Sequence, residues 1–166
     1  MEKENSKGMQ HGEHNKHYRS LLVMVILSFI SMYILMYAMV DTFSNVIPNV
    51  NQFYMAGLMA SPMLIIELII MRSMYMNKKL NGLLLATGSL ALVIFYLLIR
   101  QQAAVSDRQF LRSMIPHHAA AILMAKEAAV TDPEIKELCR TIITSQQAEI
   151  DQMKAKLKEL KSERPR

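Results

Sequence analysis

The sequence has no tryptophan and only one cysteine, Cys139, among its 166 residues. A single cysteine excludes an internal disulfide framework, and it excludes the zinc sites that are built from clusters of cysteines. The 19 Lys and Arg residues form no long basic block and are not interleaved with aromatic residues. We therefore expect no nucleic-acid binding, despite a formal net charge of +5. For Cys139, three roles stay open: burial, metal binding and cross-linking of a dimer.

The C-terminal region, residues 100–166, also lacks two common kinds of catalytic site. It contains no Glu-x-x-His pair, which a di-iron site of the ferritin type requires, so ferroxidase chemistry is not expected. Ser113 and His117 lie four residues apart, but no acid completes a nucleophile, base and acid set with an oxyanion hole. The sequence therefore predicts a protein that is not an enzyme.

Charged residues are scarce in three long apolar runs that dominate the first hundred residues. These runs are residues 21–40, which carry no charge, residues 53–71, which are interrupted only by Glu67, and residues 82–99. Each is close to the ~20 residues that an α-helix needs to cross a bilayer. The first run is too long, and begins too far from the N-terminus, for a typical cleaved signal peptide. The sequence predicts an N-terminal tail, residues 1–20, followed by three transmembrane helices within residues 21–99.

The connections between these runs differ in their basic residues. Residues 41–52 contain no Lys or Arg, whereas residues 72–81 contain three such residues and no acid. Lys16 and Arg19 lie just before the first run. Because basic residues collect on the cytoplasmic side of a membrane, we expect the N-terminus in the cytoplasm. The sequence thus predicts a bacterial inner-membrane protein whose C-terminal region, residues 100–166, is periplasmic or extracellular.

Helix-starting signals divide this C-terminal region into two helices. A first helix can begin at Ser106 or Asp107 and reach about Val130. The motif TDPE at 131–134 starts a second helix. Its aspartate precedes a proline at the first helical position, and its threonine and glutamate fit a capping box. The apolar stripe of this second helix continues to about Leu160.

Two helices of this length bury little apolar surface by themselves. We therefore expect an antiparallel helical hairpin outside the membrane that pairs with a second copy, as a homodimer or higher homo-oligomer, to complete a four-helix bundle. The expected fold class is all-α, with three transmembrane helices followed by this hairpin.

Two adjacent histidines, His117 and His118, lie in the first of these helices, within the stretch SMIPHHAAAILMAKEA at 113–128. At 100° per residue, both histidines fall within an arc of about 120° that also holds Met114 and Met124. This arc is as wide as a core-facing stripe, so we expect both histidines on the buried face. Pro116 removes a backbone donor and can bend the helix beside them.

Imidazole and thioether groups form a soft set of ligands that suits Cu(I), with Cu(II) possible through histidine alone. Zinc fits less well, because thioether is a poor zinc ligand. In the second helix Gln146, Glu149 and Met153 share a face, so Met153 can be a further ligand and the polar side chains can hold a histidine ring by a hydrogen bond. The predicted ligands are His117, His118, Met114, Met124 and Met153, supported by Asp107, Gln146 and Glu149. The alternative is that the methionines fill a core and the histidines only hydrogen-bond.

Two segments, DRQFLRSMIPHHAAAILMA and IITSQQAEIDQM, resemble the domain-of-unknown-function 305 family over roughly residues 103–158. Members carry a Met-Ile-Pro-His-His motif and a later Gln-x-x-Glu-Ile-x-x-Met motif. The resemblance implies a ferritin-like helical fold and a link to copper binding and copper tolerance, here in a membrane-anchored form. The matching positions are Asp107, Phe110, Met114, Pro116, His117, His118, Met124, Gln146, Glu149 and Met153. One departure is Ala119, where members often have glutamine.

Soft ligands also occur in the apolar runs. An acidic residue within a membrane is energetically costly, so Glu67 by default marks a functional site or a buried pair. A stripe of methionines that leads to Glu67 could carry Cu(I) through the membrane. Methionine also packs well among apolar helices, and that simpler explanation stays open. The residues of this second candidate path are Met36, Met39, Met55, Met59, Met63 and Glu67.

Three histidines near the N-terminus, His11, His14 and His17, could bind a metal weakly, although the pattern favours a solvated tail. The leading hypothesis is a membrane-anchored protein that binds Cu(I) for copper buffering, tolerance or delivery in the cell envelope, with other copper-handling envelope proteins as partners. A copper transporter or channel, and a metal-free membrane-tethered oligomerisation module, are the alternatives.

Overall fold

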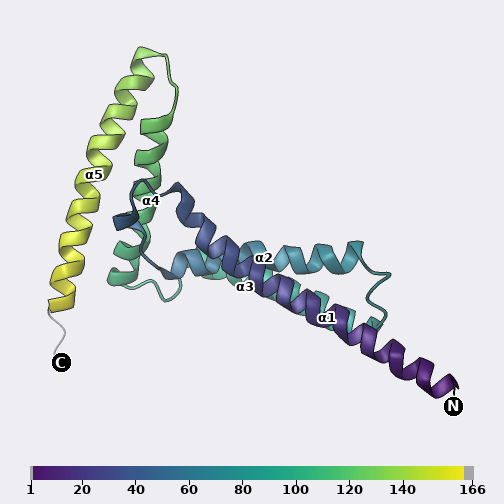
Figure 1. Cartoon of the computed structure of the whole chain (residues 1–166). Coiled ribbons are helices and arrows are strands. Elements are labelled where there is room, and N and C mark those ends of the chain that lie inside the picture. The colour runs from purple at the N-terminus through teal and green to yellow at the C-terminus, as the bar shows by residue number, and fades with distance from the viewer. Residues whose placement is uncertain (1, 163–166) are drawn as a thin grey trace. The chain divides into compact units, whose positions relative to one another are not determined.

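The computed structural model describes the backbone of residues 2–162 and the side chains of residues 16–162. Within residues 2–162 the chain forms five α-helices and two short 3-10 helices, with no strand (Figure 1). The predicted all-α class is therefore confirmed. The chain divides into two compact units. Unit 1 is made of Met1–Tyr33 and Tyr54–Gln101, and unit 2 is made of Ile34–Phe53 and Gln102–Arg166.

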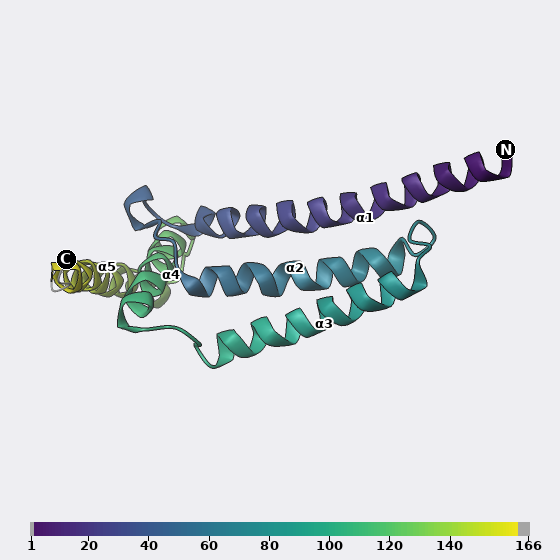
Figure 2. The same cartoon turned by 90° about the horizontal axis from the view of Figure 1, so that it is seen from below.

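Unit 1 contains most of three long helices, α1 (Glu2–Leu35), α2 (Val50–Ile70) and α3 (Lys78–Arg100), shown in Figure 2. The stretches Lys16–Met39, Val50–Ile70 and Lys78–Arg100 are each long and apolar enough to cross a membrane. The prediction of three such helices is confirmed, although all three begin earlier than predicted, most of all α1, which starts at Glu2 within the expected tail. An apolar run marks the part of a helix that avoids water, whereas its start depends on a cap. Asn77 provides that cap for α3, because its side-chain oxygen accepts the Leu80 N–H at 3.0 Å.

Most large apolar side chains of these helices are exposed in the chain alone. Leu22, Leu27, Ile66, Ile69, Leu83 and Leu90 are each about half exposed or more. Their buried contacts are concentrated in a small core of Leu21, Leu68 and Tyr75. A water-soluble surface rarely exposes so continuous an apolar area, so these helices need a further apolar environment.

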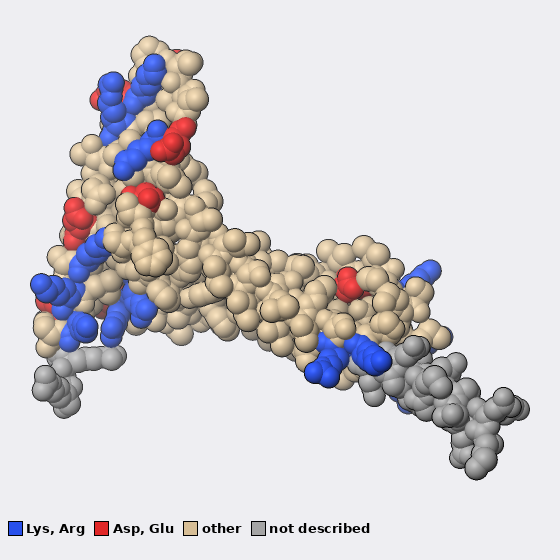
Figure 3. All heavy atoms as spheres, in the orientation of Figure 1, with Lys and Arg blue, Asp and Glu red and all other residues tan. Residues whose placement is uncertain are grey.

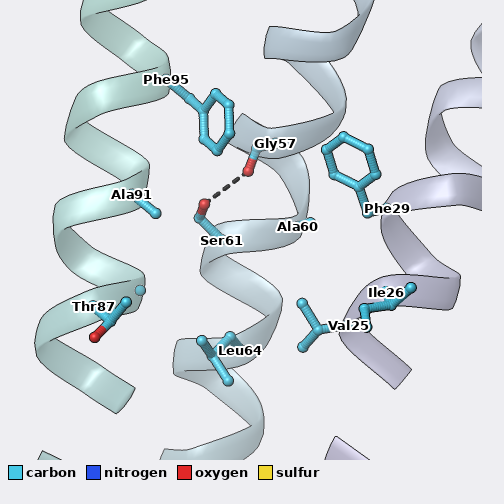
Figure 4. A pocket seen from close by; sticks show the side chains of 11 residues that line it. Val25, Ile26, Phe29, Gly57, Ala60, Ser61, Leu64, Thr87, Ala91 and Phe95 are labelled. Atoms are coloured by element: carbon cyan, nitrogen blue, oxygen red, sulfur yellow. Dashed lines mark hydrogen bonds between the residues drawn. The ribbon is translucent and has the colours of Figure 1, made fainter. Parts of the chain in front are cut away.

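A groove of about 310 Å³ lies between the three helices (Figure 4). Small residues of α2, including Gly57 and Ser61, form its floor, while Phe29 of α1 and Phe95 of α3 stand on its two sides. The Ser61 hydroxyl donates a hydrogen bond to the Gly57 carbonyl at 2.7 Å, so it is satisfied within its own helix. A Cβ atom on Gly57 would collide with the Phe95 ring, and the close approach of this ring therefore requires glycine.

In unit 2, α4 (Asp107–Glu127) and α5 (Pro133–Ser162) lie side by side (Figure 1). Their core contains only five buried apolar side chains, which are Ile115, Ala119, Ile122, Ile150 and Met153. The start of α5 matches the prediction, since the Asp132 carboxylate accepts the N–H groups of Glu134 at 2.8 Å and Ile135 at 3.0 Å. The end of α4 differs, because the helix stops at Glu127 rather than near Val130.

The segment before α2 also belongs to unit 2, which the sequence pattern did not indicate. It forms two short 3-10 helices, η1 (Met36–Met39) and η2 (Phe43–Asn45), and both contact α4. Val40 and Ile47 pack against the core between α4 and α5. These apolar residues are isolated and show no periodicity, so hydropathy alone identified residues 41–52 only as a connection.

Candidate metal centre

His118 is the buried polar residue of the α4–α5 pair, with 7% of its surface exposed. Its Nδ1 atom lies 2.9 Å from the Met114 carbonyl oxygen, one turn earlier in α4. Its Nε2 atom lies 2.6 Å from Glu149 Oε2 on α5. A carbonyl oxygen can only accept a hydrogen bond, so Nδ1 must donate and Nε2 is the nitrogen directed at the second helix.

A proton must also lie between Nε2 and Glu149 Oε2, bound to the ring or to the carboxyl group. The same ring nitrogen is the position at which a neutral, Nδ1-protonated histidine binds a metal ion. A metal ion that entered here would therefore displace this proton, and Glu149 would be left as a carboxylate beside it. The hydrogen bond from Nδ1 to the backbone meanwhile fixes the orientation of the ring.

His118 and Glu149 line a groove of about 510 Å³ on one side of the α4–α5 pair. Two methionines line the same groove, Met114 from α4 and Met153 from α5. Three of the five predicted ligands, and the predicted hydrogen-bonding residue Glu149, thus come together. The sequence analysis missed Leu111 of α4 and, on α5, two further lining residues, Gln152 and Lys156. Gln152 follows Glu149 by three residues, and Lys156 follows Met153 by three residues. This spacing places all four side chains on one face of α5 and could have predicted that they line the same groove.

His117 and Met124, the other two predicted ligands, do not line this groove. Both are exposed in the single chain, Met124 at 54%, so His118 is the histidine that lies on the buried face of the α4–α5 pair. The buried arc of α4 is centred on Ile115 and Ile122, about 100° from Met114 on a helical wheel, and His118 lies at its edge. The isoleucines therefore determine which face of α4 is buried, whereas the sequence analysis expected the buried face to be centred on the histidines.

The remaining predicted residues of α4 and α5 make no hydrogen bond to His118. Asp107 is exposed at the start of α4 and lines a neighbouring groove with Leu160. Gln146 is half-buried on α5, and no hydrogen bond links it to either histidine of α4. Ala119, which replaces the glutamine common in the family, is completely buried in the core, so this position packs here and carries no polar group.

The methionine stripe of α2 points largely outward. Met55 and Met59 are exposed, and the buried face of α2 carries small residues instead. Met63 is half-buried, and Glu67 lies three residues before the end of α2, where it accepts a hydrogen bond from the Tyr75 hydroxyl at 3.4 Å. Met36 and Met39 belong to η1 in unit 2. The described residues of unit 1 therefore form no methionine-lined channel within one copy.

No group of three or more His, Cys, Asp or Glu side chains that could hold a metal ion occurs among residues 16–162. A zinc or di-iron centre built from such ligands alone is not formed by this part of one copy of the chain. Cys139 is a free, half-buried thiol on α5. Of the N-terminal histidines, His17 is half-buried, while the side chains of His11 and His14 lie outside the described residues.

The family model for the Domain of unknown function (DUF305) matches residues 68–157. The match begins earlier than the motifs indicated and includes all of α3 and α4 and most of α5. An uncharacterised protein of Acanthamoeba polyphaga mimivirus is 38% identical over 144 residues, which is 85% of this chain and 93% of that protein. No solved structure matches the chain. The chain therefore belongs to the DUF305 family.

Proposed function

We propose that this protein is a membrane-anchored binder of Cu(I), with His118, Met114 and Met153 as its ligands. The observation that carries the proposal is that these three side chains, from two helices, line one groove. One imidazole and two thioethers form a soft nitrogen and sulfur set, which favours Cu(I) over harder ions. Glu149 Oε2 lies 2.6 Å from His118 Nε2, so a metal on this nitrogen would displace the proton between them and have the Glu149 carboxylate beside it.

The three apolar helices support anchoring in a membrane. The connection at 40–49 belongs to the same compact unit as α4 and α5, so all three must lie on the same side of that membrane. The connection between α2 and α3 and the start of α1 carry the basic residues, which favours their placement in the cytoplasm. The groove would then face the envelope side of a bacterial inner membrane. Copper buffering, tolerance or delivery to other copper-handling envelope proteins is the function that this placement suits.

The proposal includes a second copy of the chain, which would cover side chains that α4 and α5 leave exposed. Phe110, His117 and Met124 are spaced by seven residues along one exposed face of α4, and the apolar Ile135 and Leu138 of α5 are about half exposed. We propose that α4 and α5 form a hairpin that pairs with its copy as a ferritin-like four-helix bundle. His117 and Met124 would enter a bundle core, and bind copper, only in that assembly.

Titration of Cu(I) into the full-length protein in detergent tests the proposal. The His118→Ala variant should lose tight binding, and the Met114→Leu/Met153→Leu variant should weaken it. His17→Ala is the control, since it removes an imidazole from α1, outside the α4–α5 groove, and should keep tight binding. Circular dichroism checks that each variant keeps its helices. Equal binding by wild type and His118→Ala would refute the site, and no binding by wild type would favour the metal-free oligomerisation module.

A further inference from the structure

Five basic side chains gather at one end of unit 1, and we name this group the basic end. All five are exposed, and none forms an ion pair with a described residue. Figure 3 shows Lys and Arg side chains gathered at this end of the apolar helices. The group comprises Lys16 and Arg19 of α1, Arg72 of the connection between α2 and α3, and Lys78 and Lys79 of the first turn of α3.

A hydrogen-bond network joins the segments that carry these cations, although the segments are far apart in the sequence. The Tyr18 hydroxyl donates to Asn81 Oδ1 at 2.6 Å and accepts the Asn77 N–H at 3.2 Å. The Asn81 amide in turn donates to the Tyr75 carbonyl at 2.6 Å, and the rings of Tyr18 and Tyr75 lie 5.2 Å apart. The part of α1 around Tyr18 is thereby fixed against the start of α3, so the basic residues of the two helices form one surface.

The charge of this surface is not balanced by the described chain. The N-terminus of a helix carries a partial positive charge and usually has an acidic residue nearby, yet the first turn of α3 has two lysines and no acid. Glu67 is the only acidic residue among the described side chains of unit 1, and its carboxylate accepts the Tyr75 hydroxyl. Like charges held together in this way repel one another, and an anion would relieve that repulsion.

We propose that the basic end binds the phosphate group of an anionic phospholipid. The inference uses the membrane anchoring proposed above and is independent of the copper site. The basic end lies at the ends of three helices long and apolar enough to cross a membrane, so the headgroup layer is the medium that would surround it. Clusters of Lys and Arg at that level attract anionic lipids. A lipid phosphate is therefore the anion that is present at this position at high local concentration.

Native mass spectrometry of the full-length protein in detergent, with equal amounts of phosphatidylglycerol and phosphatidylcholine, tests this inference. Wild type should retain phosphatidylglycerol preferentially. The Lys78→Gln/Lys79→Gln variant should lose that preference by on the order of tenfold or more, since each cation near a membrane surface contributes substantially. The matched control is Lys158→Gln/Lys161→Gln, which removes the same charge from exposed positions of α5 and should behave as wild type.

Further arms of the experiment separate the other outcomes. Arg72→Gln alters an exposed position outside the helices and should lower the preference without affecting folding. Inorganic phosphate in excess should not displace the lipid, and its displacement would show a site for soluble phosphate instead. Equal retention of both lipids by wild type, or an unchanged preference in both basic-end variants, would refute the inference. Flotation with vesicles distinguishes the two failures, because a protein that floats without lipid preference retains the membrane anchoring.

Discussion

At the scale of single residues, His118 differs from its neighbour through its two hydrogen bonds. One ring nitrogen is bound to the backbone of its own helix and the other to Glu149 of the neighbouring helix. His117 has an exposed ring one position away. The sequence indicated that a histidine here faces a methionine-bearing helix. It did not indicate which histidine, since adjacent residues differ by about 100° on a helix and the choice depends on Ile115 and Ile122.

Tyr75 gives a prediction at this scale that depends on pH. Burial raises the pKa of its hydroxyl above the ordinary value of 10.0, and the nearby Glu67 carboxylate raises it further. The neutral phenol is therefore the form that stabilises the fold. Its contribution should be complete below about pH 10 and should be lost as the pH rises through the raised pKa.

Ultraviolet titration of the tyrosines and thermal melts at alkaline pH measure this effect. The Tyr75→Phe variant should lack one phenol whose pKa is raised, and its stability should fall less steeply above pH 10, roughly the ordinary tyrosine pKa. If the variant shows the wild-type ionisation curve and the same alkaline loss of stability, Tyr75 is not the group responsible.

At the scale of elements, the helix starts follow local chemistry and were largely predictable. Asp132 followed by Pro133 starts α5 as expected, and an asparagine that the sequence analysis did not use starts α3. The ends of helices were less predictable, because α4 stops at Glu127 without a proline or glycine to mark the end. The packing of residues 36–49 on α4 was not predictable, because it depends on the isolated apolar residues Val40 and Ile47 and on contacts distant in the sequence.

The cap of α5 gives a prediction for this scale. Asp132→Ala removes the acceptor of two backbone N–H groups and should lower the free energy of unfolding by about 1 kcal/mol. The neighbouring Thr131→Ala should change it little, since Thr131 makes no recorded hydrogen bond to the α5 backbone. Denaturant melts of the full-length variants, followed by circular dichroism, compare the two. A larger effect of Thr131→Ala would show that the capping box, and not Asp132, starts the helix.

At the scale of the whole molecule, the chain forms two compact units. Unit 1 holds most of the three apolar helices, and unit 2 holds the segment before α2 together with α4 and α5. The number of long apolar helices was predictable because hydropathy is a local property. The composition of unit 2 was not, since it joins a segment before α2 to the two helices after α3. Under the proposed membrane anchoring, this joining requires the connection at 40–49 to share one side of the membrane with α4 and α5.

Cysteine labelling tests that arrangement. In a Cys139→Ser background, Ser44→Cys and Ser162→Cys should both react with a membrane-impermeant maleimide from outside the inner membrane. Ser73→Cys, in the connection between α2 and α3, should react only after the membrane is permeabilised. All three positions are exposed in the structure. Opposite accessibility of Ser44→Cys and Ser162→Cys would contradict the composition of unit 2.

The central claim is that the soft side chains of the α4–α5 groove bind Cu(I). X-ray absorption at the copper edge of the Cu(I)-loaded, full-length protein tests it most directly, because sulfur and nitrogen ligands scatter differently. Wild type should show sulfur ligands together with a histidine nitrogen, and the Met114→Leu/Met153→Leu variant should lose the sulfur contribution of these two side chains. A copper ion bound only by nitrogen or oxygen in wild type, or an undiminished sulfur contribution in this variant, would contradict the account.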